Sequence, residues 1–136
     1  MQERALDATK NGTVNPKELL QLELLTSFEK YTKAMFKAQY HRSFIVAEHH
    51  KKMFKALQDV VDGRCKRLII NIAPRYGKTE LVIKSFISWC FALNPKCRFL
   101  HLSYSDILSN DNSETIRNIM QEELYKTLFP NSALAS

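Results

Sequence analysis

Residues 67–93, RLIINIAPRYGKTELVIKSFISWCFAL, decide the predicted fold of this 136-residue chain. The first seven are mostly apolar β-formers followed by Pro74, which predicts a short strand buried on both faces. Lys78–Leu93 is apolar nearly all round, which predicts a helix deep inside a larger body. The loop Pro74–Gly77 would then join a buried strand to a buried helix.

The flanking sequence predicts helices before this unit and a second strand after it. Asn15 can cap the first upstream helix, and Gly63 is placed to stop the second. A strand–helix–strand unit with a buried crossover helix predicts an α/β fold: an incomplete P-loop NTPase with a parallel sheet and flanking helices, preceded by two N-terminal helices. The other expected elements are helices at 16–39 and 48–62, a strand at 98–103, and helices at 105–120 and 121–129.

Composition excludes several classes of protein. With 45% apolar and 25% charged residues the chain is not of the disordered class, and 3 Gly, 4 Pro and 3 Cys exclude collagen-like and disulfide-dense proteins. The sequence contains no run of about 20 apolar residues, so we expect no membrane helix. Its polar N-terminus does not resemble a secretory signal. Cys65, Cys90 and Cys97 lack metal-site spacing, which favours free thiols in a reducing cytoplasm.

Positive charge is concentrated in one part of the sequence. The net charge is +6, and residues 29–67 hold ten Lys or Arg against four Asp or Glu, so the whole excess lies there. A local basic field suits a polyanion such as DNA or a nucleotide phosphate chain. A solvated helix face carrying lysines for solubility is the alternative interpretation.

Gly77, Lys78 and Thr79 form the end of a phosphate-binding loop pattern. Gly77 lets the backbone turn so that N–H groups point at phosphate oxygens. Lys78 would place an ammonium near the β- and γ-phosphates of ATP, and the Thr79 hydroxyl would be a ligand of Mg²⁺. The first glycine of the usual pattern is missing, because Ile72 stands at its position. The prediction therefore rests on the place of the triplet between a strand and a helix.

Arg75 lies in the loop three residues before Lys78, and both are predicted catalytic residues. An arginine there can reach the γ-phosphate and stabilise its charge, as an arginine finger does. A surface salt bridge or a contact with a DNA phosphate are the alternatives for Arg75. Glu80 can complement the dipole of the first helical turn.

Residues 67–80, RLIINIAPRYGKTE, resemble the degenerate Walker A segment of phage terminase large subunits. In that family a Pro-Arg-x-Gly-Lys-[Ser/Thr] loop follows an apolar strand. Two further stretches are similar to the family: Ala47–His50 with the helix that ends at Gly63, and Leu102–Asp106 with an exit at Leu128–Pro130. The resemblance covers about residues 40–130.

The resemblance implies an ATP-driven motor that packages viral DNA into a preformed capsid, in a family that also has a metal-dependent nuclease domain. It implies ATP and Mg²⁺ as cofactors. The implied partners are double-stranded DNA, the terminase small subunit and the procapsid portal, with no membrane, in a ring of full-length subunits in the host cytoplasm. His49 or His50 would lie near the adenine, with a helix-surface histidine as the alternative. The implied nucleotide-binding residues are Pro74, Arg75, Tyr76, Gly77, Lys78, Thr79, Glu80 and His50, with Thr79 holding Mg²⁺ through its hydroxyl.

The sequence departs from the family after the second predicted strand. ATP hydrolysis in the family needs an acidic Walker B strand and a catalytic glutamate, and no apolar strand ending in such residues follows. Glu122 and Glu123 lie in a polar, helical context, and no cluster of nuclease carboxylates is present. We therefore expect a flexible arm at 1–14, a helical region at 15–62 and a truncated P-loop ATPase core at 63–136, with no ATP turnover by the chain alone.

Two other functions fit the same sequence. One is a fragment of another P-loop DNA translocase or helicase, although that class has a fuller glycine loop. The other is a non-enzymatic basic protein that binds nucleic acid.

Overall fold

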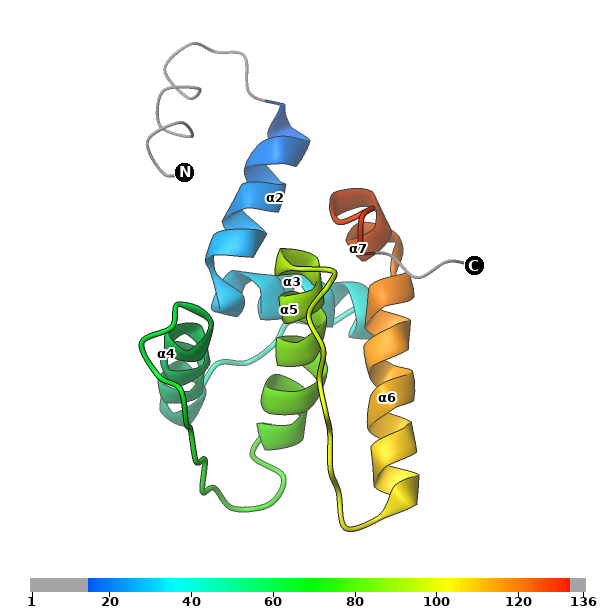
Figure 1. The fold of residues 1–136 in the computed structure, drawn as a ribbon. Coiled ribbons are helices and arrows are strands. Elements are labelled where there is room, and N and C mark those ends of the chain that lie inside the picture. Colours follow the sequence, from blue (N-terminus) through cyan, green and yellow to red (C-terminus); the bar gives the residue numbers. More distant parts are fainter. Residues whose placement is uncertain (1–14, 133–136) are drawn as a thin grey trace.

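The computed structural model describes residues 15–132, and its regular secondary structure there is entirely helical (Figure 1). Six α-helices and one π-helical segment follow one another along the described chain. The predicted flexible arm, residues 1–14, lies outside the described residues. The elements are α2 (Pro16–Thr26), α3 (Phe28–Tyr40), α4 (Glu48–Val61), η1 (Glu80–Ser85), α5 (Phe86–Leu93), α6 (Asp106–Gln121) and α7 (Glu123–Leu128).

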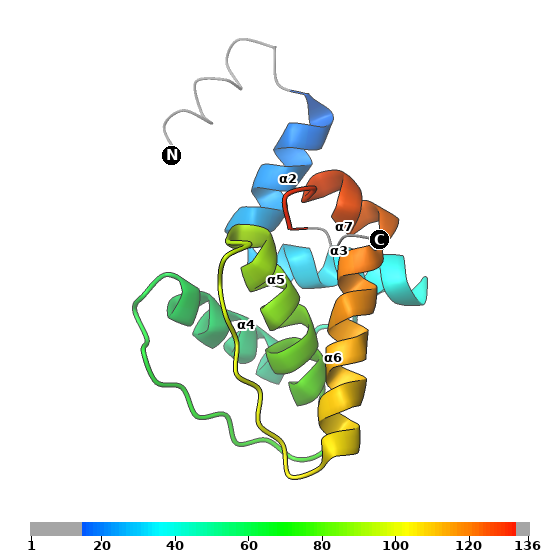
Figure 2. The same ribbon diagram turned by 45° about the vertical axis from the view of Figure 1, so that its right-hand side comes forward.

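The predicted α/β fold is wrong for the described residues, because neither predicted strand forms a ladder. Residues 67–73 (the first extended segment) and residues 98–103 (the second extended segment) are not helical, but no backbone hydrogen bond pairs them with each other or with another described residue. The two segments run in the same direction in both views, as parallel strands would (Figures 1 and 2). A strand requires a hydrogen-bonded neighbour, so the predicted parallel sheet and P-loop NTPase core are absent from residues 15–132.

The predicted helix at 16–39 is two helices, α2 and α3, which break at Ser27. Ser27 Oγ accepts a hydrogen bond from the Lys30 N–H at 3.4 Å and so caps α3. The N–H of Phe28 donates to Gln58 Oε1 on α4 at 3.1 Å. The break is thus fixed partly by a residue far along the chain. The cap predicted at Asn15 is confirmed, because Asn15 Oδ1 accepts a hydrogen bond from the Lys17 N–H at 3.0 Å.

The core is one apolar cluster that draws on every described helix and on both predicted regions, 15–62 and 63–136. Trp89, Tyr31 and Tyr125 are fully buried at its centre. Trp89 Nε1–H donates to the Leu24 carbonyl at 2.9 Å, which joins α5 to α2. Each large buried side chain contributes about 1.5–3 kcal/mol, so this cluster holds the helices together.

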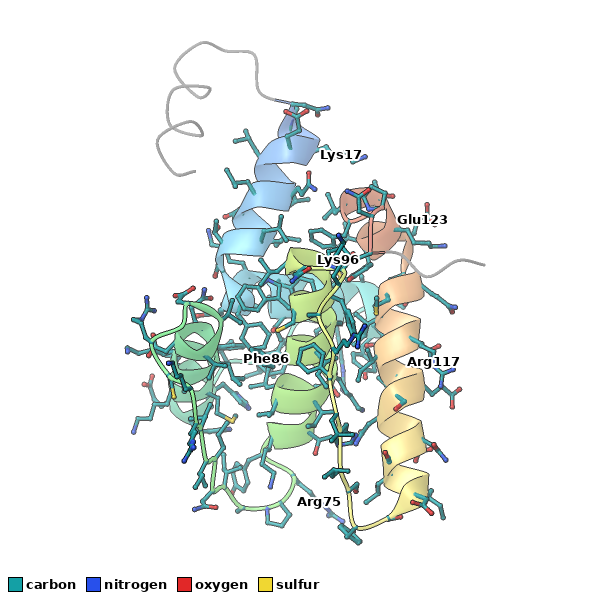
Figure 3. The ribbon with its side chains drawn as sticks, viewed as in Figure 1. Lys17, Arg75, Phe86, Lys96, Arg117 and Glu123 are labelled. Atoms are coloured by element: carbon teal, nitrogen blue, oxygen red, sulfur yellow. The ribbon has the colours of Figure 1, made fainter. Side chains whose placement is uncertain are left out.

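The helix predicted at 78–93 is confirmed and runs without interruption from Lys78 to Leu93 through η1 and α5. Its early part is π-helical, since the Phe86 N–H donates to the Leu81 carbonyl five residues before it. The loop Pro74–Gly77 precedes the first turn of this long buried helix (Figure 3). Of the helices in residues 15–132, none combines the length and the apolar character needed to cross a membrane.

Candidate functional site

The loop before the long helix alternates the sign of its backbone φ angles. Arg75 has a φ of 69° and Gly77 a φ of 82°, whereas φ at Tyr76 between them is not positive. Alternation of this kind turns successive N–H groups toward one side and makes a concavity that binds anions. The left-handed conformation costs a non-glycine residue such as Arg75 about 1–2 kcal/mol, and strain of this kind collects at functional sites.

The backbone donors of this loop are free of protein acceptors. Within the described part of the chain, none of the N–H groups from Arg75 to Glu80 donates a hydrogen bond to a protein atom. The first backbone bond of the helix is made by the Leu81 N–H, which donates to the Gly77 carbonyl at 3.0 Å. Thr79, just before η1, makes no side-chain cap. A row of unpaired donors at a helix N-terminus attracts negative charge.

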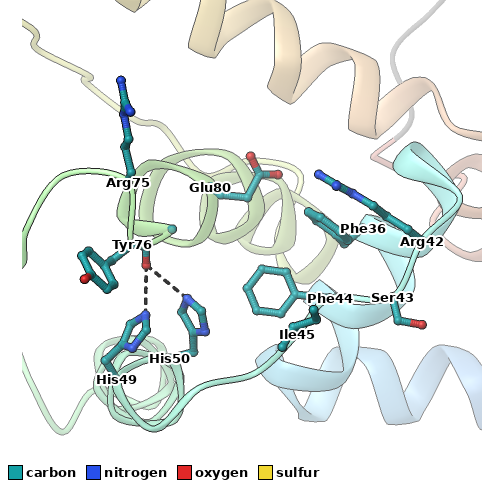
Figure 4. Close-up of a pocket in the computed structure, with 11 residues that line it drawn as sticks. Phe36, Arg42, Ser43, Phe44, Ile45, His49, His50, Arg75, Tyr76 and Glu80 are labelled. Atoms are coloured by element: carbon teal, nitrogen blue, oxygen red, sulfur yellow. Dashed lines mark hydrogen bonds between the residues drawn. The ribbon is translucent and has the colours of Figure 1, made fainter.

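Two histidines of α4 hold the carbonyl of Tyr76 (Figure 4). His50 Nε2 lies 3.1 Å and His49 Nε2 3.2 Å from this oxygen. His50 Nδ1 accepts a hydrogen bond from the Ala47 N–H at 3.0 Å, so its proton is on Nε2, which donates to Tyr76. In a planar trans peptide the N–H opposes the C=O, so the Gly77 N–H points away from α4.

His50 is held in its neutral form. Burial lowers the pKa of His50 from its ordinary value, and the neighbouring His49 lowers it further. A second proton on the ring would occupy the nitrogen that accepts from Ala47. The His50 ring lies so close to the loop that position 77 requires glycine, since a Cβ there would lie 2.9 Å from His50 Nε2.

Six of the predicted site residues line one pocket of about 410 Å³ between the loop and α4. Its other wall comes from α3 and the connector before α4, where Phe36, Phe44 and Ile45 supply an apolar surface (Figure 4). A pocket that combines an apolar wall with a few polar groups is typical of small-molecule sites. The predicted residues that line it are His49, His50, Arg75, Tyr76, Gly77 and Glu80.

The other predicted residues lie outside this pocket. Lys78 is exposed and lines a separate groove beside the long helix. Pro74 and Thr79 are exposed and line neither the pocket nor the groove. The Arg75 side chain points away from the two histidines in Figure 4, and Arg75 makes no ion pair with a described residue.

Glu80 is engaged by its neighbours. The Tyr40 hydroxyl donates to Glu80 Oε1 at 3.4 Å, and Lys84 Nζ lies 3.3 Å from Glu80 Oε2. Burial raises the pKa of Tyr40, and the Glu80 carboxylate raises it further. Glu80 therefore connects the long helix to α3 rather than presenting a free carboxylate to the loop.

Half of the ten Lys and Arg side chains of the basic region form ion pairs with carboxylates. All of these carboxylates except Glu23 lie within residues 29–67 and are already included in its net charge, so the excess positive charge rests on the side chains left unpaired in the described part of the chain. No group of three or more His, Cys, Asp or Glu in residues 15–132 is placed to hold a metal ion, and the three cysteines are free thiols. The paired basic residues are Lys30, Lys33, Lys51, Lys55 and Arg64.

Sequence reasoning missed the apolar wall of the pocket. Phe44 and Ile45 belong to a short connector about 30 residues before the loop, and no spacing pattern relates them to it. The exposure of Ile45, 85%, is the kind of feature that only a structure reveals. Comparison of the chain with protein-family models, with curated proteins and with solved structures finds no match to any of them.

Proposed function

We propose that the loop Pro74–Thr79 binds the phosphate chain of a nucleoside triphosphate, ATP by resemblance. The observation that carries this proposal is the alternating φ at Arg75 and Gly77 together with the unpaired N–H groups that follow. A phosphate oxygen would supply the missing acceptors, and the N-terminus of a long helix favours its charge.

The side chains around the loop suit the same ligand. The Lys78 ammonium is exposed at the first helical turn, where it would neutralise phosphate charge. The Thr79 hydroxyl is also exposed and would ligate Mg²⁺ together with phosphate oxygens, which is how Mg²⁺ is commonly bound in nucleotide sites. Arg75, without an ion pair of its own among residues 15–132, would contribute a second cation.

The pocket beside the loop would take the base of the nucleotide. Phe36, Phe44 and Ile45 offer an apolar surface, on which a flat base can pack. The neutral His50 keeps the Tyr76 carbonyl turned toward α4, so this oxygen would not face the phosphates. The histidines would thus act by positioning the loop.

The wider role that we propose is the ATP-binding part of a viral DNA-packaging motor of the terminase type. Its support is the likeness of residues 67–80 to the terminase Walker A segment. DNA, a small subunit and a portal as partners belong to this same proposal. We expect the isolated chain to bind ATP without hydrolysing it, because its sequence has no acidic Walker B strand after the second extended segment.

Isothermal titration calorimetry of the purified chain with Mg-ATP tests the proposal. Lys78→Ala should abolish the binding heat, because the phosphates lose the cation at the first turn. Lys96→Ala is the matched control: Lys96 is exposed beyond the other end of the long helix and should leave affinity unchanged (Figure 3). No binding by the unaltered chain, or equal affinity in Lys78→Ala, would refute the nucleotide site. Salt-sensitive DNA binding without any nucleotide effect would favour the basic nucleic-acid-binding alternative.

A further inference from the structure

The two extended segments leave most of their backbone hydrogen-bonding groups without partners among the described residues. Among the described residues, no N–H group of residues 68–73 or 98–102 donates to a protein acceptor. Both segments also expose large apolar side chains: Ile69 is 86% exposed, Leu100 85% and Leu102 80%. Open backbone edges with apolar side chains are templates for pairing with another strand.

A groove of about 410 Å³ lies between these two segments. Leu68 and Ile70 line it from the first extended segment, and Phe99 and Leu100 from the second. Apolar side chains of α4, η1 and α5 also line it. In Figure 1 the second extended segment passes in front of α5, and the first lies to the side of this helix, next to α4. Since the segments run in the same direction, a strand placed between them could pair with both.

The charge of the groove indicates the chemistry of its occupant. Lys66, Lys78 and His101 are its ionisable lining residues, and no carboxylate lines it. His101 Nδ1 is buried and has no hydrogen-bond partner among the described residues, which is costly unless a partner is supplied. The lining thus offers apolar surface and positive charge together.

We propose that this groove binds an extended polypeptide segment with alternating apolar and acidic side chains, which adds a strand between the two extended segments. Alternate residues of a strand point to opposite faces, so apolar side chains would face the helices that line the groove and acidic ones the lysines at the rim. A second copy of the chain is a poorer occupant, because its own extended segments carry Arg67 and Arg98 and would bring like charges together.

Fluorescence anisotropy tests the proposal with a fluorescein-labelled octapeptide of four Val-Glu repeats. We expect binding to the full chain, and at least tenfold weaker binding of two comparison peptides. One has four Val-Lys repeats and reverses the charge. The other is the Val-Glu peptide with every second amide N-methylated, which removes half of its backbone donors.

Two protein variants locate the binding surface. Leu100→Asp places a negative charge on an exposed groove residue and should weaken Val-Glu binding at least tenfold. Ile107→Asp makes the same change on α6, at a residue that is 73% exposed and does not line the groove, and should bind as the unaltered chain does. Mg-ATP titration of both variants is the second readout, and unchanged ATP affinity separates this proposal from the nucleotide site.

Several results would overturn the proposal. They are no binding of the Val-Glu peptide, equal binding of all three peptides, and equal loss in Leu100→Asp and Ile107→Asp. Light scattering that shows a dimer of the unaltered chain, abolished by Leu100→Asp, would assign the groove to a second copy and would also overturn it.

Discussion

Replacing Gly77 with alanine tests the contact between the loop and α4. Gly77 has a φ of 82°, and an alanine Cβ would lie 2.9 Å from His50 Nε2. The left-handed conformation costs alanine about 1–2 kcal/mol relative to glycine. Displacing the imidazole also weakens the hydrogen bond from His50 to Tyr76, worth about 1 kcal/mol. We expect Gly77→Ala to lower the free energy of unfolding by about 2–3 kcal/mol.

Gly63 supplies a matched control for the conformational part of this cost. Its φ is 78°, but an added Cβ would meet nothing within 4 Å. Gly63→Ala should therefore cost about 1–2 kcal/mol, and the loss of unfolded-state entropy on replacing glycine affects both variants alike. The difference between the two, about 1 kcal/mol, measures the contact with His50.

Urea denaturation followed by circular dichroism measures both values. Combining Gly77→Ala with His50→Ala completes the test, since the ring that the new Cβ would meet is then absent. In that background Gly77→Ala should cost no more than Gly63→Ala does. Equal destabilisation by Gly77→Ala and Gly63→Ala in the unaltered protein would refute the argument that His50 requires glycine at this position.

Two further predictions concern titration and the core. Burial lowers the pKa of His50 below its usual 6.5, so the unfolded chain binds a proton at this ring more readily than the folded chain does. The contribution of the neutral ring to the free energy of unfolding is therefore fully present above about pH 6.5 and is lost as the pH falls toward the folded pKa. Urea midpoints between about pH 5 and 8 should depend less on pH in His50→Gln, and identical profiles would contradict this. Trp89→Phe removes the donor to the Leu24 carbonyl and leaves a cavity, so we expect a loss of about 2–3 kcal/mol by chemical denaturation. A loss below about 1 kcal/mol would show that this bond does not tie α2 to α5.

The helices could largely be predicted from the sequence, whereas the absence of a sheet could not. The helix expected at 48–62 is α4 at Glu48–Val61, since its apolar spacing and the stop at Gly63 are local signals. The apolar run at 67–73 has the composition of a buried strand, but a strand exists only where another strand pairs with it. Two such segments separated by a groove satisfy the local pattern without forming a ladder.

Only part of the pocket lining was predictable from the sequence, since Pro74, Lys78 and Thr79 lie outside the pocket and its apolar wall was not predicted. The Gly-Lys-Thr triplet and the terminase resemblance pointed to the loop and to His50, and the structure brings His50 to Gly77. The contacts of the two histidines with the Tyr76 carbonyl depend on the φ angles of the loop and on the tautomer of His50. A sequence pattern encodes neither of these. The position of Lys78 on the groove side of the loop was also not predictable, because it depends on where the long helix starts its first turn.

Ser88 determines more than the packing around it. Its hydroxyl accepts from Tyr31 on α3, and its carbonyl accepts from the Tyr125 hydroxyl on α7. Rotating the long helix about its own axis would leave these buried groups without partners, so this turn helps to fix its angular orientation, together with the bond from Trp89 to the Leu24 carbonyl. Lys78 begins the same rigid helix about 15 Å away, at 1.5 Å per residue. Contacts remote from the loop therefore contribute to the direction of its first N–H groups, and Tyr125 is one of the residues through which α7 contributes.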